Sequence, residues 1–378
     1  MARSDSLSLL RALMVAAMTA LVCTACSGPS VDSAGQRIEF TATPLATQWD
    51  EVFEPGIPIE LEAPSDGPEL LAVTHLSVTS DGLLAIPNGR GHRILIYSPE
   101  GALVREVGRK GQGPGEFNVL STIVFDDADN LLAFDADGRR LSVLTPPDYT
   151  FSHSVTIESP ASRIAASQPG RVLVYTPYAE EVLFLIDLED GHMIRSTLRP
   201  EDEELQVFLG RVHTGNAQAD PFRGGFWAFY PERYAIYHYD DELSQTTRIE
   251  GGPTSSWRVS TPAFPSNLNA YDYQAAHRRW WDAQLQPIGV RILDRDLLAV
   301  TLYQSVDLRA EAYFLNLYRP DGTVVAEGLE TPFAGRVIGA HAGTVYLGID
   351  ATLDESGELQ PFRLLSYRIR DDFRASDS

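Results

Sequence analysis

Lysine and cysteine are almost absent from this chain of 378 residues. Lys110 is the only lysine, so a Schiff-base enzyme or a P-loop nucleotide-binding protein would have to use that one residue. The two cysteines, Cys23 and Cys26, both lie close to the N-terminus. Residues 27–378 therefore hold no disulfide, no thiolate nucleophile and no zinc–thiolate site.

Positive charge and long apolar runs are also scarce. The chain has 30 Lys and Arg against 52 Asp and Glu, a formal net charge of −22, and this acidity argues against a nucleic-acid partner. No stretch reaches the ~18 consecutive apolar residues of a transmembrane helix. At 44% hydrophobic residues, the chain can nevertheless bury a large core.

The N-terminus carries an export signal. Ala12 to Val22 is apolar apart from Thr19, and this length suits the h-region of a signal peptide. The following Cys23-Thr-Ala-Cys26 resembles a bacterial lipobox, with Cys23 standing where Leu is usual. We therefore predict a lipoprotein signal peptide over residues 1–25, acylation of Cys26, and attachment to a membrane of the bacterial cell envelope through this lipid. The alternative is secretory cleavage after Ala25, which would leave Cys26 as a free thiol. Residues 26–50 are interpreted as a flexible tether.

The body of the chain is a repeat of short β-strands separated by Gly, Pro, Asp and Asn turns. One four-strand unit covers residues 71–107, and the same strand order begins again at Thr122. Units of about 40 to 50 residues with four strands are typical of propeller blades. We predict an all-β, six-bladed β-propeller over residues 51–370, with a helical insertion at 251–287 and a C-terminal tail at 371–378. The sixth unit lacks a fourth strand, and the N-terminal strand Ile57–Leu61 is expected to supply it and close the ring.

A recognisable motif lies in the first unit. Gly91-His-Arg-Ile-Leu-Ile-Tyr97 and Gly111-Gln-Gly-Pro-Gly-Glu-Phe117 resemble the NHL repeat, in particular six-bladed propeller lipoproteins with a GxGPGEF turn. The resemblance covers residues 71–145 and implies the fold, which does not give the function. The glycines between Gly108 and Gly115 are interpreted as a tight turn with positive φ, because the run precedes a strand, whereas the glycines of a P-loop lead into a helix.

Metal and catalytic motifs are weak. Asp126, Asp127, Asp129, Asp135 and Asp137 are interpreted as turn residues, since no EF-hand spacing is present. None of the eight histidines forms a local metal-binding pair, although His75, His213 and His341 fall in predicted innermost strands, from which they could converge at the axis. We predict no metal and no cofactor, and we assign no catalytic residue.

The longest insertions map to one face of the predicted propeller, the face that carries the loops between the second and third strands and the connections between blades. Concentrated insertions of this kind often host binding. The helix expected at 266–285 either packs on the propeller or covers a ligand, and its arginines would favour an anionic group. The candidate rim residues are Arg90, His92, Arg109, Lys110, Gln112, Tyr178, Tyr273, His277, Arg278, Arg279, Trp280 and Trp281.

The function predicted from these features is a membrane-anchored binding module for a protein, peptide or glycan. The alternative is a metal-dependent hydrolase similar to the six-bladed lactonases and lyases, with its site on the axis. We also expect residue 50 and the C-terminus to lie on the face opposite the rim.

Overall fold

The structure is a computed structural model that describes residues 35–40, 44–64, 68–158, 163–176, 181–198, 216–230, 234–250, 272, 275, 276, 279, 285–305, 311–354 and 356–374. The expected signal peptide and most of the helical insertion lie outside these ranges. Gly35–Ser378 forms one compact unit of the chain, separate from Met1–Ala34.

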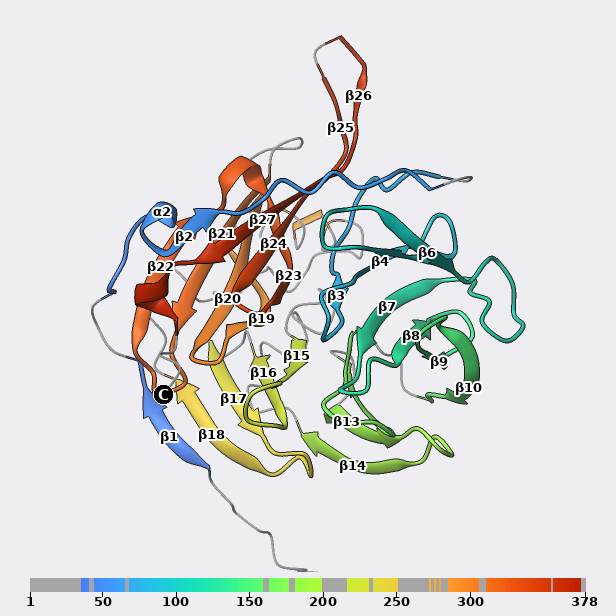
Figure 1. The fold of residues 1–378 in the computed structure, drawn as a ribbon. Helices are drawn as coiled ribbons and strands as arrows, with labels where there is room; N and C mark the ends of the chain where they lie inside the picture. The colour runs from blue at the N-terminus through green and yellow to red at the C-terminus, as the bar shows by residue number, and fades with distance from the viewer. Residues whose placement is uncertain are drawn as a thin grey trace, which may run out of the picture. The chain divides into compact units, whose positions relative to one another are not determined.

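Six antiparallel four-strand sheets form the blades in the part of the chain that the structure describes (Figure 1). Blade one consists of β3 (Ser77–Val78), β4 (Leu84–Asn88), β5 (Arg93–Tyr97) and β6 (Leu103–Val107). Blade two consists of β7 (Leu120–Phe125), β8 (Leu131–Asp135), β9 (Arg140–Thr145) and β10 (Thr150–Thr156). Blade three consists of β11 (Arg163–Ala165), β12 (Arg171–Tyr175), β13 (Glu181–Asp187) and β14 (Met193–Leu198). Blade four consists of β15 (Asn216–Ala219), β16 (Phe226–Tyr230), β17 (Ala235–Tyr239) and β18 (Gln245–Glu250). Blade five consists of β19 (Gln286–Asp294), β20 (Leu297–Ser305), β21 (Glu311–Tyr318) and β22 (Val324–Glu330). Blade six consists of β23 (Arg336–His341), β24 (Thr344–Ile349), β27 (Arg363–Ile369) and the N-terminal strand β2 (Phe53–Pro55).

The blades close into a ring. Their innermost strands contact one another in the cyclic order β3, β7, β11, β15, β19, β23 and back to β3. The second and third strands are apolar on both faces, and every residue of β5 and β8 is buried. Both faces of these strands pack against neighbouring blades; Ile94 of blade one and Leu131 of blade two, for example, belong to one core cluster. The predicted all-β, six-bladed propeller is confirmed.

An N-terminal strand closes the ring, but at other residues than those predicted. Phe53–Pro55 pairs with β27, and within the expected strand Ile57–Leu61 only Ile59 forms a bridge, with Leu364. Phe53 is fully buried, whereas Ile57 is 81% exposed. The buried Phe53 rather than the exposed Ile57 therefore marks the strand that packs into the ring.

The expected tether over residues 26–50 is ordered in its described part. β1 (Gln36–Glu39) pairs in parallel with β18 as a fifth strand of blade four, and the short helix α2 (Trp49–Val52) leads into β2. The ring of Phe40 packs on Tyr318, with 4.4 Å between the ring centroids. Apolar residues at every second position, Ile38 and Phe40, anchor this segment, although most of its sequence is small and polar.

The propeller has two distinct faces. The loop face carries the connections between blades and the loops between second and third strands, including the hairpin of β25 (Thr352–Leu353) and β26 (Leu359–Gln360), which projects beyond the blades in Figure 1. The turn face carries the turns after the first strands. There Ile369 N–H donates to the carbonyl of Gly343, and Arg370 Nε donates to the carbonyl of Asp50. Residue 50 and the end of β27, followed by the short 3₁₀ helix η3 (Asp371–Phe373), therefore lie opposite the β25–β26 hairpin, as expected.

Candidate functional site

Two adjoining cavities lie between the innermost strands. The loop-side cavity has a volume of about 290 Å³ and the turn-side cavity about 370 Å³. Both are lined by Arg163 of β11, Asn216 of β15 and Arg291 of β19. Together they make an axial chamber, the usual place for a ligand in a closed barrel or ring.

Three arginines from the innermost strands of three blades bring positive charge to this chamber. They are Arg163, Arg291 and Arg336, the last from β23. Burial, followed by the charges of Arg163 and Arg336, lowers the pKa of Arg291 to about 10. Burial and the charge of Arg336 also lower the pKa of Arg163. The lowered pKa values mean that the protonated, charged forms of Arg163 and Arg291 are less favourable in the chamber than in water when no anion is bound.

Arg336 is fixed by neighbours. Its guanidinium donates to the Tyr313 hydroxyl at 2.8 Å and to Asp350 at 3.3 Å, and it lies 4.0 Å from the Glu311 carboxylate. The Tyr313 hydroxyl in turn donates to Glu311 at 2.6 Å. Burial lowers the pKa of Arg336, but Tyr313, Asp350 and Glu311 outweigh it, so that the pKa is raised.

The backbone around Arg291 is held by blade four. The side chain of Asn216 accepts from Val290 N–H at 2.6 Å and donates to Val290 carbonyl at 3.0 Å. Gln218 accepts from Ile292 N–H at 3.1 Å. The residues on both sides of Arg291 are therefore tied to β15, which sets the position from which its side chain enters the chamber.

Two of the three histidines expected near the axis line the turn-side cavity. His75 Nε2 accepts from the Ile123 N–H at 3.1 Å, and burial, with the charges of Arg163 and Arg291, lowers the pKa of His75 to about 3. Burial also lowers the pKa of His341, against the opposing charge of Asp129. His75 is thus a neutral link between blades one and two, and its Nε2 lone pair is used; His213 lies outside the described residues.

Asp126 and Asp135 of blade two form turns, as predicted, and Asp126, Asp127 and Asp129 also line the turn-side cavity. Asp126 accepts from the backbone N–H groups of Ala128 and Asn130 at 2.9 Å. Asp135 accepts from Asn118 and Val119 N–H groups at 2.8 and 2.9 Å. These contacts satisfy the carboxylates of Asp126 and Asp135 within the protein, and Asp129 accepts from the Ser80 N–H of blade one at 2.8 Å.

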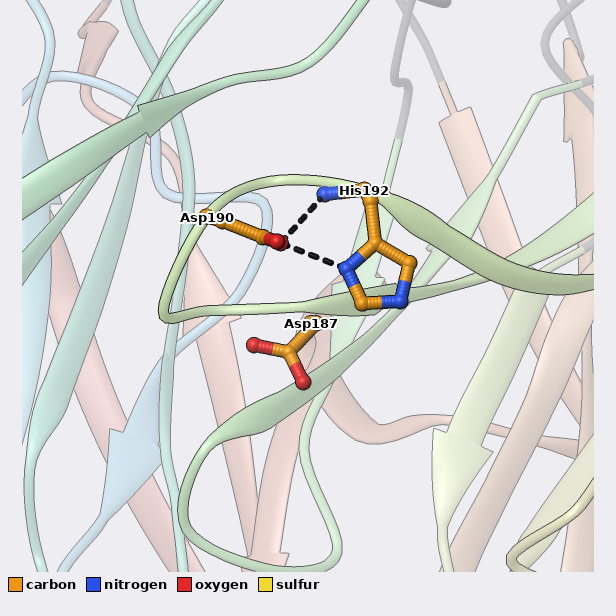
Figure 2. A group of neighbouring side chains, drawn as sticks. All are labelled: Asp187, Asp190 and His192. Atoms are coloured by element: carbon orange, nitrogen blue, oxygen red, sulfur yellow. Dashed lines mark hydrogen bonds and ion pairs between the residues drawn. The ribbon is translucent and has the colours of Figure 1, made fainter.

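One group of side chains with metal-ligating atoms occurs among the described residues, at the exposed turn between β13 and β14 (Figure 2). Asp190 accepts from the backbone N–H of His192 at 2.9 Å and contacts its ring Nδ1 at 2.5 Å. Asp187 accepts from the Glu189 N–H. The hydrogen bond and charge of Asp190 raise the pKa of His192. Turn formation accounts for this cluster, which belongs to the outer strands and not to the axial chamber.

The glycine run is the tight turn that the sequence predicts, with positive φ at Gly108, Gly111 and Gly115. A Cβ at Gly108 would lie 2.4 Å from the Phe117 ring. The Glu116 carboxylate holds the loop by accepting from the Gly113 N–H and from Arg109 at 2.9 and 2.8 Å.

The candidate rim residues of blade one lie on this loop and its neighbour. Arg90 and Lys110 are exposed; His92 contacts the Asn118 carbonyl at 2.8 Å, which joins the two loops. The side chain of Arg109 is engaged with Glu116, and the carbonyl of Gln112 accepts from Arg140 at 2.6 Å. Arg279 is described only as an exposed helical residue. The remaining candidates, Cys26, Tyr178, Tyr273, His277, Arg278, Trp280 and Trp281, lie outside the described residues.

The three axial arginines are not among the site residues predicted from the sequence. A signal was present in β19, where Arg291 stands between Val290 and Ile292 inside an apolar strand. A charged side chain in such a position is rarely buried without a partner or a function. Arg163 and Arg336 each begin an innermost strand, and nothing local distinguishes them from arginines at other strand ends.

Comparisons with known proteins support the fold. Residues 47–187 match a family model described as a 6-bladed beta-propeller. The chain is similar to the solved structure of a candidate exported protein from Bacteroides fragilis, with 16% identity, 89% of this chain and 100% of that chain covered, and a TM-score of 0.61. It is also similar to a member of the DUF4221 family from Bacteroides vulgatus, with 10% identity, coverage of 84% and 98%, and a TM-score of 0.59. No curated protein sequence matches the chain.

The described part of the chain contains no helix with the length and apolar character that a membrane span requires.

Proposed function

We propose that this protein is an extracytoplasmic binding module, held at a membrane of the bacterial cell envelope by a lipid on Cys26, that takes its ligand at the axial chamber and the loop face. The observation that carries the proposal is the polar chamber at the axis, into which three arginines project from separate blades. The ligand class is a protein, a peptide or a glycan, of which the chamber would hold one group or one chain end.

The positions of the chain ends support this orientation. Residue 50 lies on the turn face beside the end of β27. β1 pairs in parallel with β18, which runs toward the loop face, so the first described residue of the propeller, Gly35, also lies at the turn face.

The lipid anchor is tested by fractionation. The full-length protein is expected in the membrane fraction, and Cys26→Ser is expected in the soluble extract, with loss of palmitate labelling. Cys23→Ser is the matched control and should stay membrane-bound. A Cys26→Ser protein that remains in the membrane fraction would contradict lipid anchoring.

Binding is tested with the full-length protein, extracted in detergent and applied to glycan and peptide arrays. Arg90→Ala changes an exposed loop-face arginine, and Arg295→Ala changes an exposed arginine at a turn-face turn. We expect captured ligands to be lost or weakened with Arg90→Ala and retained with Arg295→Ala. Equal effects of the two changes would contradict a site on the loop face.

The alternative is a metal-dependent hydrolase of the lactonase or lyase type. It requires several metal-ligating side chains gathered at the axis. The turn-side cavity is lined by side chains of that kind, His75, His341, Asp126, Asp127 and Asp129. Among the described residues, however, their ligating atoms do not form a group close enough to hold one ion, and the Nε2 of His75 is used by the Ile123 N–H. Metal in the purified protein together with lactone hydrolysis would favour this alternative over the binding module.

A further inference from the structure

We propose that Arg163, Arg291 and Arg336 form an oxyanion site on the propeller axis, which takes the carboxylate or phosphate group of a small ligand or of a chain end. This inference rests on the proposed function, because it names the chemical class that the axial chamber binds.

The charge of the loop-side cavity differs from that of the chain. Acidic residues outnumber basic ones by 52 to 30 in the sequence. In the described lining of the loop-side cavity, however, three arginines meet one carboxylate, that of Glu311. The turn-side cavity is lined by Asp126, Asp127 and Asp129 as well as by arginines, so an anion would be attracted to the loop side of the axis.

The charge of Arg291 is not balanced by any described residue. Glu311 and Asp350 both lie beside Arg336, so they offset the charge of that arginine. No described residue accepts a hydrogen bond from Arg291 or forms an ion pair with it. Arg291 is partly buried, and withdrawing a charge from water is costly unless the charge is paired, so an anion would supply a partner for Arg291.

The neutral polar groups of the same cavity already have partners. Asn216 bonds the backbone of Val290, Thr301 donates to the carbonyl of Gly289, and Thr331 donates to the carbonyl of Tyr313. The guanidinium of Arg291 is thus the strong donor that remains directed at the chamber. A guanidinium presents a planar pair of N–H groups that matches two oxygens of a carboxylate or phosphate.

The size of the chamber sets the limit on the ligand. A volume of about 290 Å³ on the loop side is at the small end of ligand pockets and accommodates a small organic anion or the end of a longer chain. Tyr313 holds the guanidinium of Arg336 in place before an anion arrives. Asn216 and Gln218 fix the backbone on both sides of Arg291, so only the side chain of Arg291 has to be ordered by the anion.

The test measures the thermal midpoint and the affinity of the detergent-extracted full-length protein with inorganic phosphate, with succinate, and with chloride at equal ionic strength. We expect phosphate or succinate to raise the midpoint beyond the effect of chloride, and the more effective of the two identifies the ligand group. Arg291→Gln should weaken that affinity tenfold or more without lowering the midpoint of the ligand-free protein, because it removes a partly buried charge that has no partner among the described residues. Arg105→Gln, a change on the exposed outer strand β6, should bind as the unchanged protein does.

Arg291→Lys keeps the positive charge but removes the planar pair of N–H donors. This second variant is measured in the same way, so the site can still be tested if Arg291→Gln does not fold. It should weaken binding severalfold. An oxyanion effect no larger than that of chloride, or equal binding by the unchanged protein and the Arg291 variants, would overturn the site. Binding of a neutral glycan or peptide without any oxyanion effect would overturn the site and leave the proposed binding function; binding of no class of ligand would overturn both.

Discussion

The backbone N–H of Arg370, close to the C-terminus, donates a hydrogen bond of 2.9 Å to the carbonyl of Val52. The contact extends the pairing of β2 with β27, through which the two ends of the propeller share blade six. Phe53 follows Val52, is fully buried, and packs its ring 4.2 Å from that of Trp49. The stability of the ring therefore depends on a three-residue strand far from its partner in sequence.

Phe53→Ala should destabilise the protein by about 3–5 kcal/mol, because it leaves a cavity where the ring closes. The free energy of unfolding in urea is the measurement. Ile57→Ala is the matched control; Ile57 is 81% exposed, and its loss should change stability by less than about 0.5 kcal/mol. Equal effects would mean that the closing strand lies at 57–61 instead.

Gly108→Ala should destabilise the turn before blade two. At Gly108 φ is +87°, and an added Cβ would lie 2.4 Å from the Phe117 ring. We expect a loss of about 2–4 kcal/mol, from backbone strain and overpacking together. Gly170→Ala separates the two causes, because φ there is +83° with no atom within 4 Å of the added Cβ. Its cost should be the strain alone, about 1 kcal/mol; urea unfolding that gives the two variants the same cost would contradict the clash.

Tyr313→Phe should loosen Arg336. The hydroxyl that is removed accepts from Arg336 and donates to Glu311, so its loss should cost about 1–2 kcal/mol in unfolding free energy and weaken binding of the oxyanion. Tyr346→Phe is the control, since no hydrogen bond from the Tyr346 hydroxyl to a described residue is present and neither quantity should change. Unchanged binding by Tyr313→Phe would argue against a role of Tyr313 in positioning Arg336.

His75 should make stability depend on pH between about 3 and 6.5. In the folded protein the pKa of His75 is lowered to about 3, so the unfolded chain takes up a proton in this range and the folded chain does not. Stability is therefore complete above pH 6.5 and is lost as pH falls, by roughly 1.4 kcal/mol per pH unit for one group.

Urea unfolding at several pH values compares the unchanged protein with His75→Gln, which should show a shallower slope in that range. His192→Gln is the control at an exposed histidine, whose pKa is raised by Asp190, and it should leave this loss of stability in place. A slope that is the same with and without His75 would contradict a neutral buried imidazole.

The fold could be predicted from the sequence because each blade is formed mostly by strands that follow one another in the chain. Each strand of blade one pairs with its neighbour in the chain, and the Gly, Pro and Asp residues between strands mark the turns. The closing strand was misplaced by a few residues, since β2 pairs with β27 at the opposite end of the chain and no local pattern reports that register. The residues around Phe40 were misread for the same reason, because their partner strand β18 is distant in sequence.

The sequence by itself determined the repeat, the number of blades and the glycine turn, since these follow from hydrophobic pattern and turn chemistry between neighbouring residues. It also restricted cysteine to the N-terminus and lysine to one position. Only the tertiary structure brought Arg163, Arg291 and Arg336 together. They stand on separate blades, and their side chains meet because ring closure directs the innermost strands of all blades to one axis.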